Sequence, residues 1–158
     1  MHATFKPHHF LDFIYEMAEN NGVFDTFSPY GHIMGYYGNL LSAGEIDTVS
    51  FTSGADDACS PCKKLAEGIC TDVFPPDVAL RYGVERKYDY NMMLDKAFFA
   101  ALPTVFQPES PRSIDEIYAL LREKLTPEII LLNWPRDNRV ELTLKGLDMA
   151  VNARKNRR

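Results

Sequence analysis

Long apolar runs are missing from this sequence. No stretch approaches the roughly 18 consecutive apolar residues that a membrane-spanning helix requires. The residues from Met1 to Pro7 contain no basic region followed by an apolar core, so we expect no secretory signal peptide. Internal repeats and low-complexity stretches are missing as well. These absences argue against a membrane partner and favour a cytoplasmic location.

Positive charge and cysteine are also scarce. The chain has 17 lysines and arginines against 22 aspartates and glutamates, which gives a formal net charge of −5. Polyanion binding rests on clustered Lys and Arg, so this balance argues against nucleic acid as a partner. The basic tail over residues 153–158 is predicted to be the solvated end of a helix. An odd number of cysteines, three, without a secretion signal points to a reducing compartment and away from a disulfide framework.

The apolar pattern predicts the α+β class, mainly α, in a small single domain that spans residues 1–158. A content of 46% hydrophobic residues over 158 residues suffices for one buried core. One short strand is predicted around Val49 and Phe51, where apolar and hydroxyl residues alternate. The C-terminal part, residues 87–158, is predicted to be helical, although Val140 to Val151 fits strand and helix spacing equally well.

Capping residues and prolines indicate where the helices begin. The predicted starts are Pro7, Ser28 with Pro29 in the first turn, Asp89, Ser113 and Thr126. Ser113 and Glu116 have the spacing of a capping box. Three glycines share one face of the second predicted helix, where each costs about 1 kcal/mol relative to alanine. Gly31, Gly35 and Gly38 therefore predict a close backbone approach, unless this helix is simply poorly formed.

The segment 54–76 carries all the cysteines and is predicted to be a long ordered loop. Cys59 and Cys62 are separated by two residues, and Cys70 follows after seven more. A two-residue gap lets both thiolates face one ion or cluster, as in zinc sites and iron–sulfur loops. Two other interpretations remain open: three cysteines buried as small hydrophobic residues, and a thioredoxin-like redox pair. A structureless loop of this length is usually functional or held by a ligand, which favours a metal site.

The first predicted helix offers candidates for a fourth ligand. His8 and His9 precede Asp12 by four and three residues, so either pair can share a helical face. A site of two histidines and one carboxylate for iron is conceivable on this pattern. The plainer alternative makes His8 and His9 neutral helix-start residues that hydrogen-bond to the backbone. His32 has no partner visible in the sequence and is expected to be incidental.

Two of these segments resemble an uncharacterised bacterial and archaeal family, domain of unknown function 1284. The similarity lies in Phe5 to Leu11, with its Pro-His-His core, and in Asp56 to Cys62, followed by Cys70. Proteins of this family are described as candidate iron–sulfur binders without an established activity. The resemblance implies a cluster held by the cysteines. The family has a further cysteine where this chain has Asp12, so the resemblance implies either Asp12 as fourth ligand or an iron open to substrate.

Three functions follow from these patterns as hypotheses. The first is a 4Fe–4S protein that uses Cys59, Cys62 and Cys70 with Asp12 or His9, either for electron transfer to a redox partner protein or as a Lewis acid. The second is a closed structural zinc site. The third is a regulator, because Val140 to Leu147 looks like the stretch where winged-helix domains leave the wing and enter their last helix. The sequence does not choose between catalysis, electron transfer and structure.

Overall fold

The N-terminal segment forms an edge strand of a small sheet whose centre is the segment at Thr48–Phe51. The computed structural model describes residues 1–108, 110–133, 136 and 138–157. Strand β1 (His2–Phe5) pairs in parallel with β2 (Thr48–Phe51), and β5 (Arg112–Ser113) pairs antiparallel to β2. The predicted strand at Val49 and Phe51 is thus confirmed, whereas β1 and β5 were not predicted. Parallel neighbours need a crossover connection, which α1 and α2 provide here.

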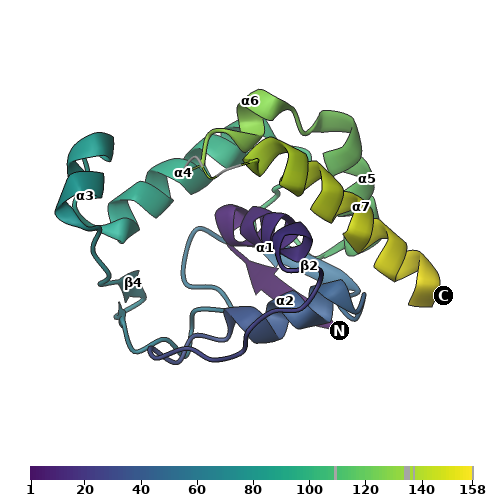
Figure 1. Ribbon diagram of the computed structural model, residues 1–158, viewed down its shortest axis with the longest axis horizontal. Helices are drawn as coiled ribbons and strands as arrows, with labels where there is room; N and C mark the ends of the chain where they lie inside the picture. The colour runs from purple at the N-terminus through teal and green to yellow at the C-terminus, as the bar shows by residue number, and fades with distance from the viewer. Residues whose placement is uncertain (109, 134–135, 137, 158) are drawn as a thin grey trace.

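Helix α1 (Pro7–Glu19) is the predicted first helix, and Pro7 occupies its first turn. It lies near the middle of the molecule in Figure 1, with α7 (Arg139–Arg157) running across it. Most of its side chains are buried, so it is a core helix. The carbonyl oxygen of Ile14 would lie 1.8 Å from a Cβ at position 146. Gly146 therefore permits the backbones of α1 and α7 to approach closely.

Helix α2 (Met34–Ser42) begins later than predicted. Residues 28–33 form turns instead, where the Ser28 hydroxyl accepts a hydrogen bond from the Tyr30 N–H and Gly31 has a φ of +78°. The predicted close approach holds for the two glycines inside the helix. A Cβ on Gly35 would lie 1.9 Å from the Asp25 carbonyl oxygen, and one on Gly38 would lie 2.4 Å from the Phe24 ring.

The cysteine segment is ordered but not wholly irregular. Residues 55–64 form successive turns, and a small hairpin follows, with β3 (Leu65–Ala66) antiparallel to β4 (Ile69–Cys70). Glu67 and Gly68, both with positive φ, make the two-residue turn between these strands. A short helix that was not predicted, α3 (Pro76–Tyr82), follows the segment.

The C-terminal half is helical, as predicted. Helix α4 (Lys87–Ala101) begins two residues before Asp89, which pairs with Arg86 instead of capping the helix. Helix α5 (Ile114–Lys124) follows Ser113, but no side-chain hydrogen bond from Ser113 caps it, so the predicted capping box is wrong. Thr126 does cap α6 (Pro127–Ile130) with its side chain.

The ambiguous segment from Val140 to Val151 is helical throughout as part of α7, so its strand interpretation is wrong. The wing required by the winged-helix hypothesis is not found at this place within the described ranges. Arg154, in the predicted solvated tail, instead donates to the Gly44 carbonyl and pairs with Asp47 and Asp115. Arg158, the end of that tail, lies outside the described residues.

One cluster of buried apolar side chains spans both halves of the chain. It joins β1, β2 and α1 to α4, α5 and α7. The sheet is therefore not a separate unit, and the beginning of α1 is held between the cysteine segment on one side and α4 on the other.

Candidate metal centre

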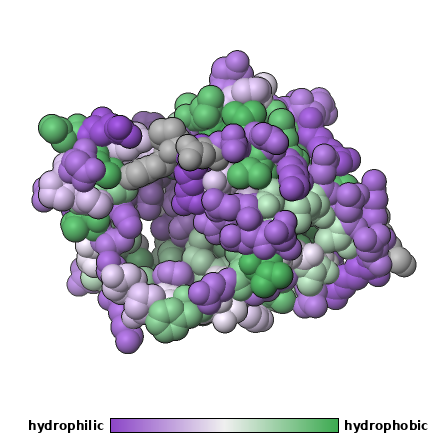
Figure 2. All heavy atoms as spheres, in the orientation of Figure 1, coloured by the Kyte–Doolittle hydropathy of each residue, from purple (hydrophilic) through white to green (hydrophobic). Residues whose placement is uncertain are grey.

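A cleft of about 880 Å³ opens beside α1. Its wall comes from α1, the segment between α1 and α2, the cysteine segment, α4 and the residues around the start of α7. Figure 2 shows the hollow with hydrophilic residues around it. The volume is in the range of small-molecule sites in proteins. Such a volume is larger than a metal ion alone requires.

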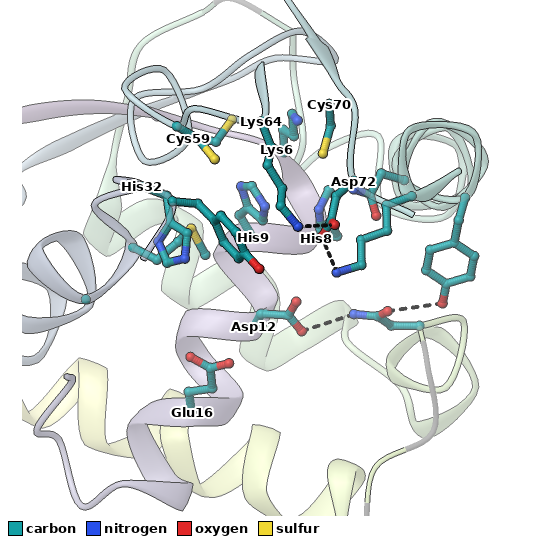
Figure 3. A pocket seen from close by; sticks show the side chains of 18 of the residues that line it. Lys6, His8, His9, Asp12, Glu16, His32, Cys59, Lys64, Cys70 and Asp72 are labelled. Atoms are coloured by element: carbon teal, nitrogen blue, oxygen red, sulfur yellow. Dashed lines mark hydrogen bonds and ion pairs between the residues drawn. The ribbon is translucent and has the colours of Figure 1, made fainter. Parts of the chain in front are cut away.

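The three cysteines all line this cleft. Cys59, Cys62 and Cys70 are half-buried, and none forms a disulfide bond. Figure 3 shows the sulfur atoms of Cys59 and Cys70 at the end of the cleft that His8 and His9 also line. The fold thus brings together the cysteine segment and the paired histidines, which lie about fifty positions apart in the sequence. No helix opens at Cys62, so the setting of a thioredoxin-like pair is not formed at this place.

Asp56 ties the cysteine segment to the beginning of α1. One of its carboxylate oxygens accepts hydrogen bonds from the Lys6 N–H at 2.9 Å and from His9 Nδ1 at 2.6 Å. The other oxygen accepts from the Cys59 N–H at 3.0 Å. Burial alone would raise the pKa of Asp56, but His9 and these donors outweigh it and hold the pKa far below its usual value. Asp56 is therefore a buried carboxylate that joins two segments.

Each of the paired histidines is held by its own carboxylate. His8 Nδ1 lies 2.8 Å from Asp95, which also accepts the His8 N–H at 3.0 Å. Burial and the neighbouring His9 lower the pKa of His8. Burial also acts to lower the pKa of His9, but Asp56 outweighs it and the pKa is raised. The histidines bind carboxylates, whereas the plainer sequence interpretation had them bind the backbone.

These carboxylates orient the two imidazole rings. A ring that donates its Nδ1 proton to a carboxylate leaves Nε2 with its lone pair, and metal-binding histidines are commonly held in this way. Neither His8 Nε2 nor His9 Nε2 has a hydrogen-bond partner among the residues that the structure describes. Both rings line the cleft, so each can offer a ligand atom or a proton acceptor there.

The distances between candidate ligand atoms show which side chains could share a single metal ion. Within the described residues, only His9, Asp56 and Cys59 offer three ligand atoms that all lie within 4.8 Å of one another. A zinc ion with Zn–S bonds of about 2.3 Å needs thiolates about 3.8 Å apart. Among the described residues, the three cysteines do not form such a compact group. The compact group therefore contains one thiol, Cys59, together with an imidazole and a carboxylate.

Asp12 lines the same cleft but is engaged by other residues. Its carboxylate accepts hydrogen bonds from Asn133 Nδ2 at 3.0 Å and from Arg139 at 3.1 Å. Glu16, one turn further along α1, pairs with Arg136 at 3.3 Å. Asp12 is therefore not part of the compact group around His9, and its role as fourth ligand stays a prediction.

His32 and Asp95 were missed as site residues. His32 was expected to be incidental, yet it lines the cleft, and its buried Nδ1 has no hydrogen-bond partner in the described part of the chain. Asp95 lies 87 positions from His8, so no local spacing could have connected them. From the sequence, Asp56 could be recognised as a negative charge near the cysteines. The hydrogen bonds that it accepts from Lys6 and His9 could not be predicted, because those residues are about fifty positions away.

Comparison with protein families, with curated proteins and with solved structures found no match for this chain. The resemblance to domain of unknown function 1284 therefore stays a prediction. Among the helices in the described ranges, none combines the length and the apolar character needed to cross a membrane.

We expect Asp56→Asn to lower the free energy of unfolding by about 2–3 kcal/mol, because a buried carboxylate with three donors would be replaced by a neutral amide whose NH₂ group also faces them. The loss should be greatest above pH 4. The low pKa of Asp56 in the fold means that its stabilisation is present above the unfolded pKa of about 3.9 and disappears as the pH falls further. Urea unfolding at pH 7 and pH 3 measures both effects.

The matched control is Asp57→Asn, one position further along. Asp57 is half-buried and accepts one hydrogen bond, from the Thr4 N–H at 2.7 Å. Asp57→Asn should lower the free energy of unfolding by much less than Asp56→Asn does. Equal losses in the two variants would show that Asp56 is not the main link between α1 and the cysteine segment.

Proposed function

We propose that this chain binds a 4Fe–4S cluster through Cys59, Cys62 and Cys70. The observation that carries the proposal is that three free, half-buried thiols line the same cleft. They lie on a segment that Asp56 ties to the beginning of α1. Iron–sulfur clusters are held by cysteine thiolates, with histidine as an occasional substitute. His9, beside Cys59, would be the fourth ligand, or one iron would remain open to the cleft.

The metal-free site is expected to hold Cys59 as a thiol. Burial, with a further contribution from Asp56, raises the pKa of Cys59 to about 11. Metal ligands must be deprotonated, so assembly of the site would release a proton. Free thiols also fit a reducing compartment, and we infer a cytoplasmic location for the chain.

A zinc ion is the second candidate, and one observation favours it. His9, Asp56 and Cys59 bring three ligand atoms within 4.8 Å of one another, a distance that a small movement would reduce to that of a single ion. The existing hydrogen bonds of Asp56 count against this site, because both of its oxygens already accept N–H donors. Coordination by Asp56 would therefore break part of the link that orders the segment.

Protein purified without oxygen tests the proposal. We expect a brown sample with broad visible absorption that holds iron and acid-labile sulfide at about four of each per chain, the composition of a 4Fe–4S cluster. A colourless sample with one zinc per chain would favour the second candidate. A colourless sample without metal, even after anaerobic reconstitution with iron and sulfide, would refute both.

Two functions are open to a cluster bound at this site: electron transfer and Lewis-acid catalysis. Electron transfer would require a redox partner protein that docks near the cysteine segment, whose hairpin turn is exposed. Lewis-acid catalysis would require an open iron and room for a substrate. The size of the cleft favours the second use, because electron transfer needs no cavity.

A further inference from the structure

Lys6 presents an unpaired cation to the cleft. The residue is 8% exposed and lies directly before α1, where its backbone N–H bonds to Asp56. Its ammonium group forms no hydrogen bond or ion pair within the part of the chain that the structure describes. That nitrogen is not among the buried, unpartnered atoms of the described residues, so the stem of the side chain is buried while its charged end reaches the water of the cleft. The ammonium group is therefore available to a ligand that enters the cleft.

The other cations of the cleft are paired. Among the described lining residues, Lys64 and Lys87 share Asp72, while Arg136 pairs with Glu16 and Arg139 with Asp12. Lys64 also lies over the Tyr30 ring at 3.8 Å. Each of these four cations has a carboxylate partner, although the two lysines share a single one. Among the described cations that line the cleft, Lys6 is the one without a carboxylate partner.

Lys6 lies at the cysteine end of the cleft, as Figure 3 shows. His9 and Cys59 line the same cleft. The N-terminus of α1 begins beside it and adds the partial positive charge of a helix dipole. Asp12 and Glu16 lie further along α1, away from this end. The cleft thus has a positive end at Lys6 and acidic side chains beyond it.

We propose that the cleft binds a small organic anion whose carboxylate or phosphate group is held by Lys6. A charged acceptor supplies the partner that the ammonium lacks, and the hydrogen bond between them is charge-assisted. The volume of about 880 Å³ leaves room for the rest of such a molecule, with its hydroxyl or amino groups near Asp12 and Glu16. The inference goes beyond the proposed function because it rests on Lys6 and the cleft, with or without metal at the cysteines.

Calorimetric titration with inorganic phosphate and with malonate tests the proposal on the protein as purified. We expect saturable binding of at least one anion in the millimolar range or tighter. Lys6→Met keeps the length of the side chain and removes the charge, and it should weaken that binding by about tenfold or more. The anion that binds more tightly distinguishes a phosphate ligand from a carboxylate ligand. Lys145→Met, on the exposed face of α7 and away from the cleft, is the matched control.

Stability and metal content make the test decisive. Because the ammonium group reaches water and methionine keeps the buried stem, Lys6→Met should keep its melting temperature within about 2 °C of the wild type. Its metal content should stay as in the wild type. The proposal is overturned if the wild type binds neither anion, if Lys6→Met binds as well as the wild type, or if Lys6→Met loses its metal. Metal-free wild-type protein that still binds an anion through Lys6 would refute the proposed cluster alone.

Discussion

Simultaneous replacement of Cys59 and Cys62 by serine is expected to leave the protein without bound metal. The two cysteines lie in one turn, in which the Cys62 N–H bonds to the Cys59 carbonyl at 2.9 Å, and both line the cleft. A serine hydroxyl is a poor substitute for a thiolate, and Cys70 alone cannot hold a cluster. Iron and sulfide analysis after anaerobic purification should fall from full occupancy to background.

Ser60→Ala is the matched control for this variant. Ser60 lies between the two cysteines, is exposed, and has no thiol to lose. The metal content of Ser60→Ala should equal that of the wild type. Cys70→Ser should lose its metal, as the double variant does. A double variant that retains full metal content would show that the cysteines are not the ligands.

We expect Gly146→Ala to destabilise the protein strongly, although it adds only one methyl group. Its Cβ would lie 1.8 Å from the Ile14 carbonyl oxygen, so α1 and α7 would have to separate. Alanine gains about 1 kcal/mol of helix propensity over glycine. Overpacking of a core costs about 1–3 kcal/mol, and more where the backbone itself must move. The steric cost therefore exceeds the gain in helix propensity. We expect chemical unfolding to show a free energy of unfolding lower by about 3 kcal/mol or more.

Lys145→Ala, one residue earlier in α7, serves as the control. Lys145 is exposed, and exposed helical changes of this kind usually stay within about 0.5 kcal/mol. Because α1 carries His8 and His9, the altered crossing should also reduce the metal content of Gly146→Ala. A variant as stable as the wild type would mean that α1 and α7 can separate without cost.

The sequence predicted the elements whose signals are local. Pro7 and the apolar spacing after it located the start of α1, and Thr126 with Pro127 located the start of α6. The three cysteines line one cleft, while their predicted sharing of one metal or cluster stays a prediction. In each case the physical cause lies within a few residues of the feature: a missing N–H, a side-chain cap, or a two-residue gap.

Features that depend on distant residues could not be predicted in this way. Strand β1 alternates polar and apolar residues over only four positions, too few to predict a strand, and it is held by its pairing with β2. The ambiguity of Val140 to Val151 was resolved by packing against α1, since both spacings were present in the sequence. Asp95 holds His8 from 87 positions away. Ser113 failed as a cap although its spacing was correct, because Glu116 pairs with Arg112 instead.

The buried carboxylate of Asp56 also determines when the cysteine segment becomes ordered. Its hydrogen bonds to Lys6, His9 and Cys59 form between protein groups alone, so folding itself places the segment. In zinc fingers the ion must instead supply the free energy of folding. In this protein the free energy of cluster binding is therefore not needed to order the cysteine segment. A cluster could therefore be inserted, lost to oxidation and rebuilt while the polypeptide around it stays native.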